Sequence, residues 1–291
     1  MAYPLEHHEV TTNGIRLHVV QCGPARGPLV LLLHGFPEFW YAWRHQIPAL
    51  ADAGFRVWAP DQRGYNLSDK PRRVRDYAID QLAADIIGLI NAAGEQTAAV
   101  VGHDWGAAVA WHLAAHHPDR ISRAAILNVP HPQVLSRALR RKPGQLLKSW
   151  YVFFFQLPWV PEALVRLRGW WLGRKTLRGT SRRGTFTDED LALYRAAWAQ
   201  PRAMRSMINW YRAAGRYARW LSQAGRVRVP VRIIWGEKDA FLKPELAHES
   251  LAFCDDGHLT YLRATHWVQH ERAEEVNEIL LDFLTSDNNT N

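Results

Sequence analysis

The chain has 291 residues, of which 47% are hydrophobic and 22% charged, and its formal net charge is +8 at pH 7. This length and balance exclude a largely disordered chain and fit one α/β core that carries an insertion. The two cysteines, Cys22 and Cys254, lie far apart and match no metal-ligand or redox spacing, so they predict neither zinc nor a disulfide framework.

The N-terminus and the distribution of charge limit the compartment and the partners. Residues 1–10 are polar, with no basic segment followed by an apolar run, and no apolar run approaches the length of a membrane span. We therefore expect a cytoplasmic protein without a membrane partner, either a monomer or a homodimer. Residues 137–228 hold 17 Arg and 3 Lys against 4 acidic residues. Because these cations are scattered through helical sequence, we interpret them as solvated helix faces and expect no specific nucleic-acid partner.

Short apolar runs rich in β-branched residues alternate with longer helical patterns along the chain, which is typical of βαβ units. The sequence therefore predicts an α/β fold with a mostly parallel central sheet flanked by helices. Helices fill the intervals, notably 106–116 and 271–284, and the residues after Thr285 are expected to fray. The expected strands are 14–20, 29–33, 56–59, 98–101, 123–127, 231–235 and 259–263.

A long interruption separates the last two expected strands from the others. Residues 132–229 contain no convincing strand, but they show helical periodicity, and prolines punctuate them where helices should begin or end. We interpret residues 134–228 as a helical cap inserted into a core of residues 1–133 and 229–291. An apolar pocket is expected between cap and core. The interruption contains seven tryptophans, Trp150, Trp159, Trp170, Trp171, Trp198, Trp210 and Trp220.

The most informative motif lies between the strand 98–101 and the helix that follows it. Residues 100–108 read VVGHDWGAA, the nucleophile-elbow pattern Gly-x-Asp-x-Gly, with Asp104 where lipases and esterases have serine. Small residues on both flanks let this strained turn pass close to its neighbours, so the central side chain projects alone. Asp104 could instead only cap the helix. A dinucleotide-binding loop is disfavoured because its glycine spacing does not match.

A second motif ends the strand 29–33, where residues 33–37 read LHGFP. A turn of this type offers backbone N–H groups, and we predict an oxyanion hole formed by the N–H groups of Phe36 and Trp105. A cis peptide bond is expected between Phe36 and Pro37, because proline lowers the cost of the cis form. His34 and Pro37 are expected to line the substrate pocket.

In this fold the acid and the histidine follow the nucleophile along the chain. His266, in ATHW after the last expected strand, is the candidate base. His270 is its nearest competitor, but it opens the final helix, where a solvated role is expected. Asp239, in GEKD, is the candidate acid that orients His266 and stabilises its cation, although it could also be an ordinary turn residue. The acid could instead follow the preceding strand, but Asn128 stands at that position and no carboxylate is available there.

An aspartate nucleophile limits the chemistry. Attack of a carboxylate on a carbonyl gives an easily reversed anhydride, whereas attack on a saturated carbon gives a stable ester. The substrate is therefore expected to carry a leaving group on an sp3 carbon, and the ester must be hydrolysed by a water that His266 activates. No metal and no organic cofactor is implied.

These stretches resemble the soluble epoxide hydrolase branch of the α/β-hydrolase superfamily, and the resemblance covers nearly the whole chain. Besides GHDWG, the similar stretches are HGFPEFWYAWR at residues 34–44 and DQRGYNLSDKP at residues 61–71. Asn66 stands where many members have glycine, a departure that is expected to affect only a loop. The resemblance implies that a small apolar epoxide is the substrate and that it is opened to a vicinal diol.

The resemblance also implies two cap tyrosines that bind the epoxide oxygen. Tyr151, five residues before Gln156, and Tyr211, in NWYR, match their positions. A phenol suits this task because it donates a hydrogen bond from an apolar wall and protonates a forming alkoxide. Either tyrosine could also be an ordinary core residue. Trp150 and Phe154 are expected to line the pocket beside Tyr151.

Two other functions stay open. A haloalkane or haloacid dehalogenase shares the fold, the aspartate and the histidine. Haloacetate dehalogenases typically place Arg after the nucleophile and a His-Trp pair in the first cap helix, where this chain has Trp105 and Trp150-Tyr151. Trp105 could still donate its indole N–H to a halide. A non-catalytic ligand-binding homologue would lack a member of the triad, and all three members are present.

Overall fold

The computed structural model describes residues 3–217, 221 and 224–286. In this part of the chain eight strands form one sheet in the order β1-β2-β4-β3-β5-β6-β7-β8. Strand β2 pairs antiparallel with β1 and β4, and every other neighbouring pair is parallel. The strands are β1 Glu6–Thr12, β2 Ile15–Cys22, β3 Leu29–Leu33, β4 Arg56–Pro60, β5 Ala98–His103, β6 Ile121–Leu127, β7 Val231–Gly236 and β8 Gly257–Leu262.

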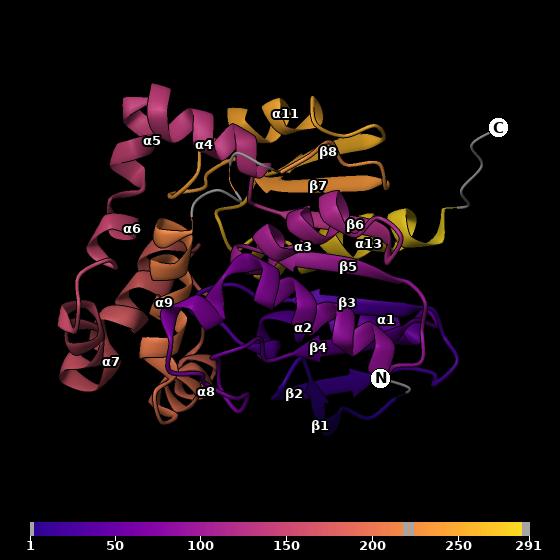
Figure 1. Cartoon of the computed structure of the whole chain (residues 1–291), viewed down its shortest axis with the longest axis horizontal. Coiled ribbons are helices and arrows are strands. Elements are labelled where there is room, and N and C mark those ends of the chain that lie inside the picture. Colours follow the sequence, from indigo (N-terminus) through magenta and orange to yellow (C-terminus); the bar gives the residue numbers. More distant parts are fainter. Residues whose placement is uncertain (1–2, 218–220, 222–223, 287–291) are drawn as a thin grey trace.

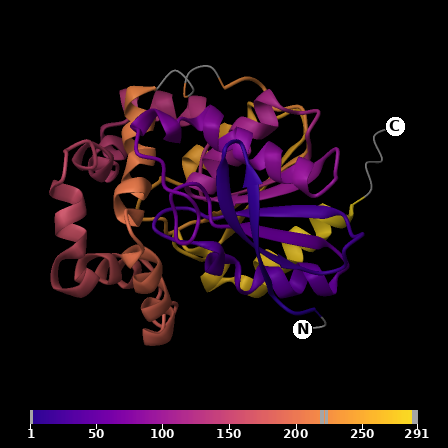
Figure 2. The same cartoon turned by 60° about the horizontal axis from the view of Figure 1, so that its bottom comes forward.

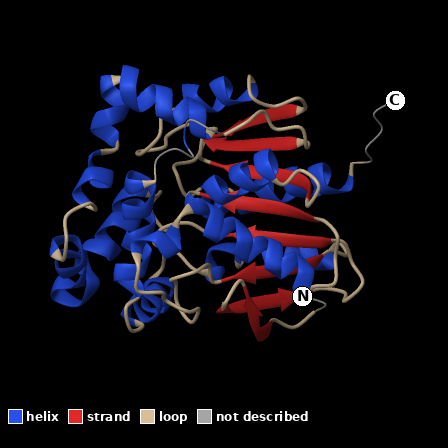
Figure 3. Ribbon diagram, viewed as in Figure 1, coloured by secondary structure: helices blue, strands red, loops and turns tan. Residues whose placement is uncertain are grey.

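Helices cover both faces of the sheet, which explains why β3 is apolar at every position (Figures 1 and 3). Successive side chains of a strand point to opposite faces. Leu31 belongs to one apolar cluster with α2 and α3, whereas Leu32 belongs to the other with α1 and α13. The helices and short 3-10 turns of this layer structure are η1 Trp40–Trp43, α1 Gln46–Asp52, η2 Val74–Tyr77, α2 Ile79–Ala92, α3 Trp105–His116, α11 Glu245–Leu251, α12 Val268–Glu271 and α13 Ala273–Thr285.

A run of helices follows β6 and precedes β7, and the described residues of this interval contain no strand. Figure 1 shows these helices beyond the edge of the sheet where the parallel strands end. That edge is where ligands bind in α/β folds. Trp220, one of the seven tryptophans of this interval, lies outside the described residues. The helices are α4 Pro132–Arg141, α5 Pro143–Lys148, α6 Trp150–Phe154, α7 Val160–Thr180, α8 Asp188–Ala199 and α9 Ala203–Arg216.

Most arginines of these helices are exposed, but the interpretation as solvated faces is wrong for Arg212. Its side chain is buried and forms an ion pair of 2.7 Å with Glu162 of α7. It also donates hydrogen bonds to the carbonyl oxygens of Phe155, at 3.1 Å, and Leu157, at 2.6 Å. Arg212 therefore ties α9 to the segment that joins α6 and α7.

The predicted fold class is confirmed, and each expected strand is present with ends shifted by at most two residues. Strand β1 was not expected. Its sequence, EHHEVTT, is largely exposed because it pairs only with β2 at the sheet edge, so it shows no apolar run. The peptide bond between Phe36 and Pro37 is cis, as predicted. Of the tail expected to fray, residues 287–291 lie outside the described part of the chain.

Candidate active site

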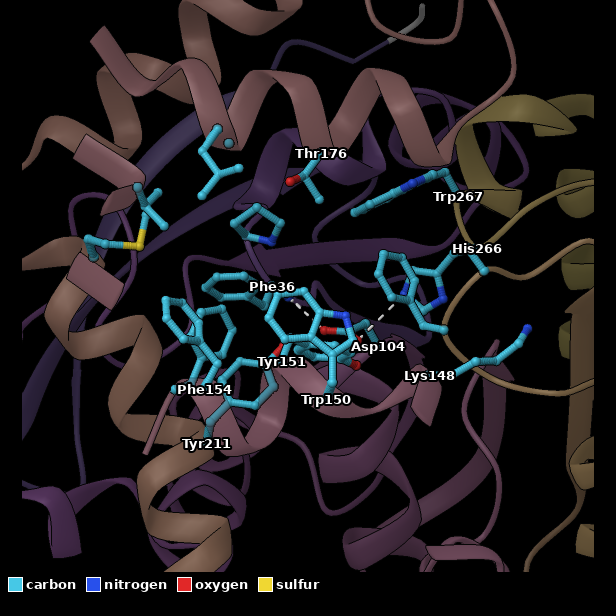
Figure 4. A pocket seen from close by; sticks show the side chains of 18 of the residues that line it. Phe36, Asp104, Lys148, Trp150, Tyr151, Phe154, Thr176, Tyr211, His266 and Trp267 are labelled. Carbon is cyan, nitrogen blue, oxygen red and sulfur yellow. Dashed lines mark hydrogen bonds and ion pairs between the residues drawn. The ribbon is translucent and has the colours of Figure 1, made fainter. Parts of the chain in front are cut away.

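Asp104 lies at the sharp turn between β5 and α3. Its backbone has φ 49° and ψ −122°, a conformation that a residue with a side chain adopts only under local strain. The turn also requires glycine at position 106, because a Cβ there would collide with the carbonyl oxygen of Leu33. The neighbouring strand therefore presses against the backbone of the turn, and the Asp104 side chain is left to project into a cavity (Figure 4).

Both oxygens of the Asp104 carboxylate have partners. Oδ1 accepts a hydrogen bond of 2.7 Å from the backbone N–H of Phe36, and Oδ2 lies 3.5 Å from Nε2 of His266. Trp105, the other expected oxyanion donor, is the first residue of α3, and its ring contacts the Tyr211 ring edge-on at 5.1 Å between centroids. The carboxylate thus lies between a backbone donor and an imidazole.

His266 follows β8 and is buried. Its Nδ1 donates a hydrogen bond of 2.7 Å to Oδ2 of Asp239, which leaves Nε2 facing Asp104. Burial alone would lower the pKa of His266, but attraction to Asp239 and Asp104 outweighs burial and raises the pKa to about 10. The imidazole is therefore protonated at neutral pH.

Asp239 is buried and has four hydrogen-bond donors. Its Oδ2 accepts bonds from His266 and from the side chain of Asn128, both at 2.7 Å, and its Oδ1 accepts from the N–H groups of Phe241 and Leu242. Burial would raise the pKa of Asp239, but these donors and the His266 cation hold the pKa below its ordinary value. The side chain is therefore an ionised anchor for His266.

Asn128 is the site residue for which the sequence predicted no role. Its side-chain oxygen accepts a hydrogen bond of 3.0 Å from the N–H of Gly236, while its amide nitrogen donates to Asp239. Asn128 thus holds the carboxylate against the end of β7. Its position directly after β6, on the same sheet edge as Asp104, was the available signal.

A buried polar cluster around Glu38 supports the same region and corrects the expectation for His270. The Glu38 carboxylate accepts hydrogen bonds of 2.7 Å from His270, 2.7 Å from the Tyr194 hydroxyl and 3.1 Å from Gln269. Burial would raise the pKa of Glu38, but His270 and His103 hold it well below its ordinary value. The His270 side chain is fully buried, so the expectation that it is solvated is wrong. His103 donates in turn to the carbonyl oxygen of His266, at 2.8 Å.

A cavity of about 480 Å³ opens in front of Asp104, between the sheet edge and the helices α5 to α9. This volume is within the range of pockets that bind small molecules. His266 and the predicted pocket residues Pro37, Trp150 and Phe154 line it. His34 does not line it: this side chain is buried behind the turn and accepts a hydrogen bond of 3.0 Å from the N–H of Gln62.

Tyr151 of α6 and Tyr211 of α9 lie across the cavity from His266 (Figure 4). Their rings meet edge-on, 6.0 Å apart between centroids. Burial raises the pKa of both phenols, and the nearby Asp104 carboxylate raises the pKa further. Both side chains therefore stay neutral and able to donate a hydrogen bond at physiological pH.

The described residues contain no group of three or more His, Cys, Asp or Glu side chains placed to hold a metal ion. Within the same residues, no helix is both long and apolar enough to cross a membrane. Cys22 and Cys254 are both buried and form no disulfide.

Known proteins resemble this chain over nearly all of its length. The family of the alpha/beta hydrolase fold matches residues 28–273. The AB hydrolase superfamily protein YfhM of Bacillus subtilis (strain 168) is 48% identical over 276 residues, which cover 94% of this chain and 96% of the relative. Epoxide hydrolase 4 of Homo sapiens is 36% identical over 282 residues, covering 94% of this chain and 77% of the relative.

Solved structures agree with this relationship. Epoxide hydrolase A from Mycobacterium thermoresistibile is 34% identical, with a TM-score of 0.83, and the match covers 97% of this chain and 98% of that one. A variant of an epoxide hydrolase from Bacillus megaterium, bound to its naphthyloxy-propanediol product, is 32% identical with a TM-score of 0.88; the match covers 96% of this chain and 100% of that one. The chain therefore belongs to the α/β-hydrolase family, among the epoxide hydrolase-like enzymes. This relationship confirms the resemblance expected from the sequence.

Proposed function

We propose that the protein hydrolyses epoxides to vicinal diols through a covalent ester with Asp104. The relatives named epoxide hydrolases support the reaction class. The observation that carries the proposal is the Asp104 carboxylate itself, which faces the cavity between the Phe36 N–H at 2.7 Å and His266 at 3.5 Å. A nucleophile, a base and donors for a developing negative charge are thereby held around one point.

In the first step, Oδ2 of Asp104 attacks an epoxide carbon and the carbon–oxygen bond of the ring breaks. The electron pair of that bond goes to the epoxide oxygen, which takes a proton from Tyr151 or Tyr211. The structure supports this assignment because both phenols line the cavity and are kept neutral by burial. An apolar wall strengthens their hydrogen bonds to a forming alkoxide.

In the second step, His266 removes a proton from a water molecule, and the hydroxide adds to the ester carbonyl carbon of Asp104. Negative charge collects on Oδ1, which the Phe36 N–H already contacts, and we assign the Trp105 N–H as its second donor. Collapse of this intermediate breaks the bond between the carbonyl carbon and Oδ2, which leaves as a hydroxyl oxygen of the diol with the proton of the added hydroxide. The phenolate regains its proton from His266. The diol leaves, and Asp104 regains its carboxylate with one oxygen from water.

The cavity favours an epoxide over an alkyl halide. Halide release needs N–H donors directed at the leaving group. In this cavity the indole N–H groups of the tryptophans are the candidates for that role. Two of the lining indoles are already engaged: Trp198 donates to the Pro37 carbonyl oxygen at 2.6 Å, and Trp267 donates to the Thr180 hydroxyl at 2.9 Å. The two phenols remain as donors beside the Trp150 indole, and phenols suit an alkoxide.

We propose further that residues 134–228 act as a cap over a core of residues 1–133 and 229–291. Helices α4 to α9 lie between β6 and β7, and the cavity is lined from both sides. In this arrangement the core supplies the nucleophile and the base, and the cap supplies the two phenols. Arg212 supports it by holding α9 to the segment after α6.

The reaction class is tested by parallel assays on a styrene-type epoxide, a haloalkane and a haloacetate, with diol and halide measured side by side. We expect diol from the epoxide and no halide. Halide release without diol would make the protein a dehalogenase. The variant Asp104→Asn tests the proposed nucleophile in the same assay. Its matched control is Asp188→Asn, because Asp188 is an exposed carboxylate paired with Arg178.

Covalent catalysis is tested by a single turnover in water enriched in heavy oxygen. The first diol should carry no solvent oxygen, because its new oxygen comes from Asp104, and the label should stay on the protein. Solvent oxygen in the first diol would exclude the ester. His266→Gln should accumulate the alkyl-enzyme as a mass adduct on the peptide that contains Asp104.

A further inference from the structure

The outer side of helices α5 to α7 carries an unusual number of exposed apolar side chains. Among the described residues, ten of the fifteen large apolar side chains that are exposed lie between residues 146 and 171. Leu147 is 75% exposed, Trp159 70% and Phe153 58%. Single exposed apolar residues are common, but a concentration of this size marks an interaction surface. We call these ten side chains the α5–α7 face.

Helical spacing places members of this face on common sides of their helices. Leu146, Trp150, Phe153 and Leu157 follow one another at intervals of three or four residues along α5, α6 and the turn after them. Side chains three or four residues apart lie on one side of a helix. Figures 1 and 2 both place α7 on the side of the insertion away from the sheet, with α9 between them. The exposed fractions of these side chains show that they face solvent, and two of them, Leu147 and Trp150, also border the cavity.

Positive charge surrounds the α5–α7 face. Residues 141–187 hold ten Arg and Lys against one acidic residue, Glu162, which Arg212 already engages. Two of the ten, Lys142 and Arg178, pair with carboxylates outside this segment. Two others lie over tryptophan rings: Lys175 is 4.7 Å from the centroid of the Trp171 ring, and Arg166 is 5.9 Å from that of Trp170. Tryptophans with neighbouring Arg and Lys are the composition of a helix surface that lies in the interface of an anionic bilayer.

The cavity opens at this same face. Leu147 and Trp150 are exposed and also line the cavity, so they belong both to the α5–α7 face and to the mouth of the pocket. Lys148, between them in sequence, lines the mouth as well. A surface seated on a bilayer would therefore bring the mouth of an apolar pocket against the phase in which apolar compounds concentrate.

We propose that the α5–α7 face docks on the surface of an anionic lipid bilayer. Charge complementarity decides between this occupant and a second copy of the chain. In a two-fold symmetric dimer the same patch meets itself, so the cations of one copy would face the cations of the other. An anionic lipid surface instead attracts each of them. This proposal departs from the expectation of no membrane partner, which rested on the lack of an apolar run long enough to cross a membrane. A docking surface needs no such run.

The test is flotation of the purified full-length protein with lipid vesicles. Vesicles of phosphatidylcholine are compared with vesicles that contain about 30% phosphatidylglycerol, and we expect binding at least about tenfold tighter to the latter. Raising the salt to about 0.5 M should weaken binding, because salt screens the attraction. The variant Phe153→Ser/Trp159→Ser/Leu167→Ser should lose at least about tenfold in affinity. None of these three residues lines the cavity.

The matched control is Leu67→Ser/Leu193→Ser, which removes two exposed leucines outside the α5–α7 face and should bind vesicles like the wild type. Thermal unfolding checks that both variants are folded, so no measurement depends on the proposed reaction. Equal binding to the two kinds of vesicle, or equal loss in the control, would overturn the proposal. So would a wild-type dimer that the triple variant dissociates while neither protein binds vesicles, because the occupant would then be a second copy.

Discussion

Replacing Asp104 with asparagine isolates the electrostatic coupling between this carboxylate and His266. Asparagine keeps the size of the side chain and removes its charge, as esterification does. At the observed 3.5 Å, with an effective dielectric constant near 20, the attraction between these two charges is about 5 kcal/mol. Loss of that attraction should lower the pKa of His266 from about 10, although the larger attraction to Asp239 remains and still opposes the effect of burial.

The assay is NMR titration of the His266 imidazole in the wild type and in Asp104→Asn, with the signal assigned from the spectrum of His266→Gln. In the wild type the imidazole should stay protonated until the pH approaches 10. In Asp104→Asn it should lose its proton at lower pH. Titration of His266 at the same pH in both proteins would refute the coupling, and Asp188→Asn should leave it unchanged.

The free energy of unfolding should depend on the same titration of His266. Because the folded pKa of His266 lies above the unfolded value, its cation stabilises the fold fully below pH 6.5, and this contribution is lost as the pH rises toward 10. Urea unfolding across this range should show a decline in the free energy of unfolding that is smaller, and ends at lower pH, in Asp104→Asn than in the wild type. A wild-type free energy of unfolding that rises between these values would contradict the raised pKa.

Four further substitutions test the rest of the site. Tyr151→Phe and Tyr211→Phe should each lower kcat/KM for an epoxide by about a hundredfold while the unfolding midpoint changes little, since each removes one proton donor. Asn128→Ala should cost about 1.5–3 kcal/mol in urea unfolding, because a buried carboxylate loses a charge-assisted bond, and kcat should fall with it; an unchanged kcat would mean that His266 is held without Asn128. Gly106→Ala should give little folded protein or lose activity, because its Cβ would meet the Leu33 carbonyl oxygen; normal expression and turnover would show that the elbow can relax.

The residues that sequence could place are those whose geometry is set locally. The elbow at Asp104 is encoded by its neighbours, because a strand, a strained turn between small residues and a helix follow one another directly. His266 could be placed because it follows the last strand of the sheet. Strand β1 could not be predicted from the sequence, because an edge strand that is exposed along most of its length shows no apolar pattern.

Residues whose contacts are distant in sequence could not be placed. Asn128 reaches Asp239 across 111 positions, and His103 reaches His266 across 163. His270 was misjudged because its neighbours, Gln269 and Glu271, are polar and look solvated, whereas the folded chain buries it against a carboxylate 232 positions away. No local pattern records such a pairing, since it arises only when the sheet edge assembles.

The charge of Asp104 connects the two halves of the proposed reaction. While Asp104 is ionised, its charge raises the pKa of Tyr151, Tyr211 and His266 alike. Esterification removes this charge at the moment when the alkoxide forms. The two phenols then become stronger acids just as a proton is needed, and the imidazole loses the partner that kept it protonated. Once deprotonated, it can activate water. One carboxylate, by changing from anion to ester, therefore switches the site from ring opening to ester hydrolysis.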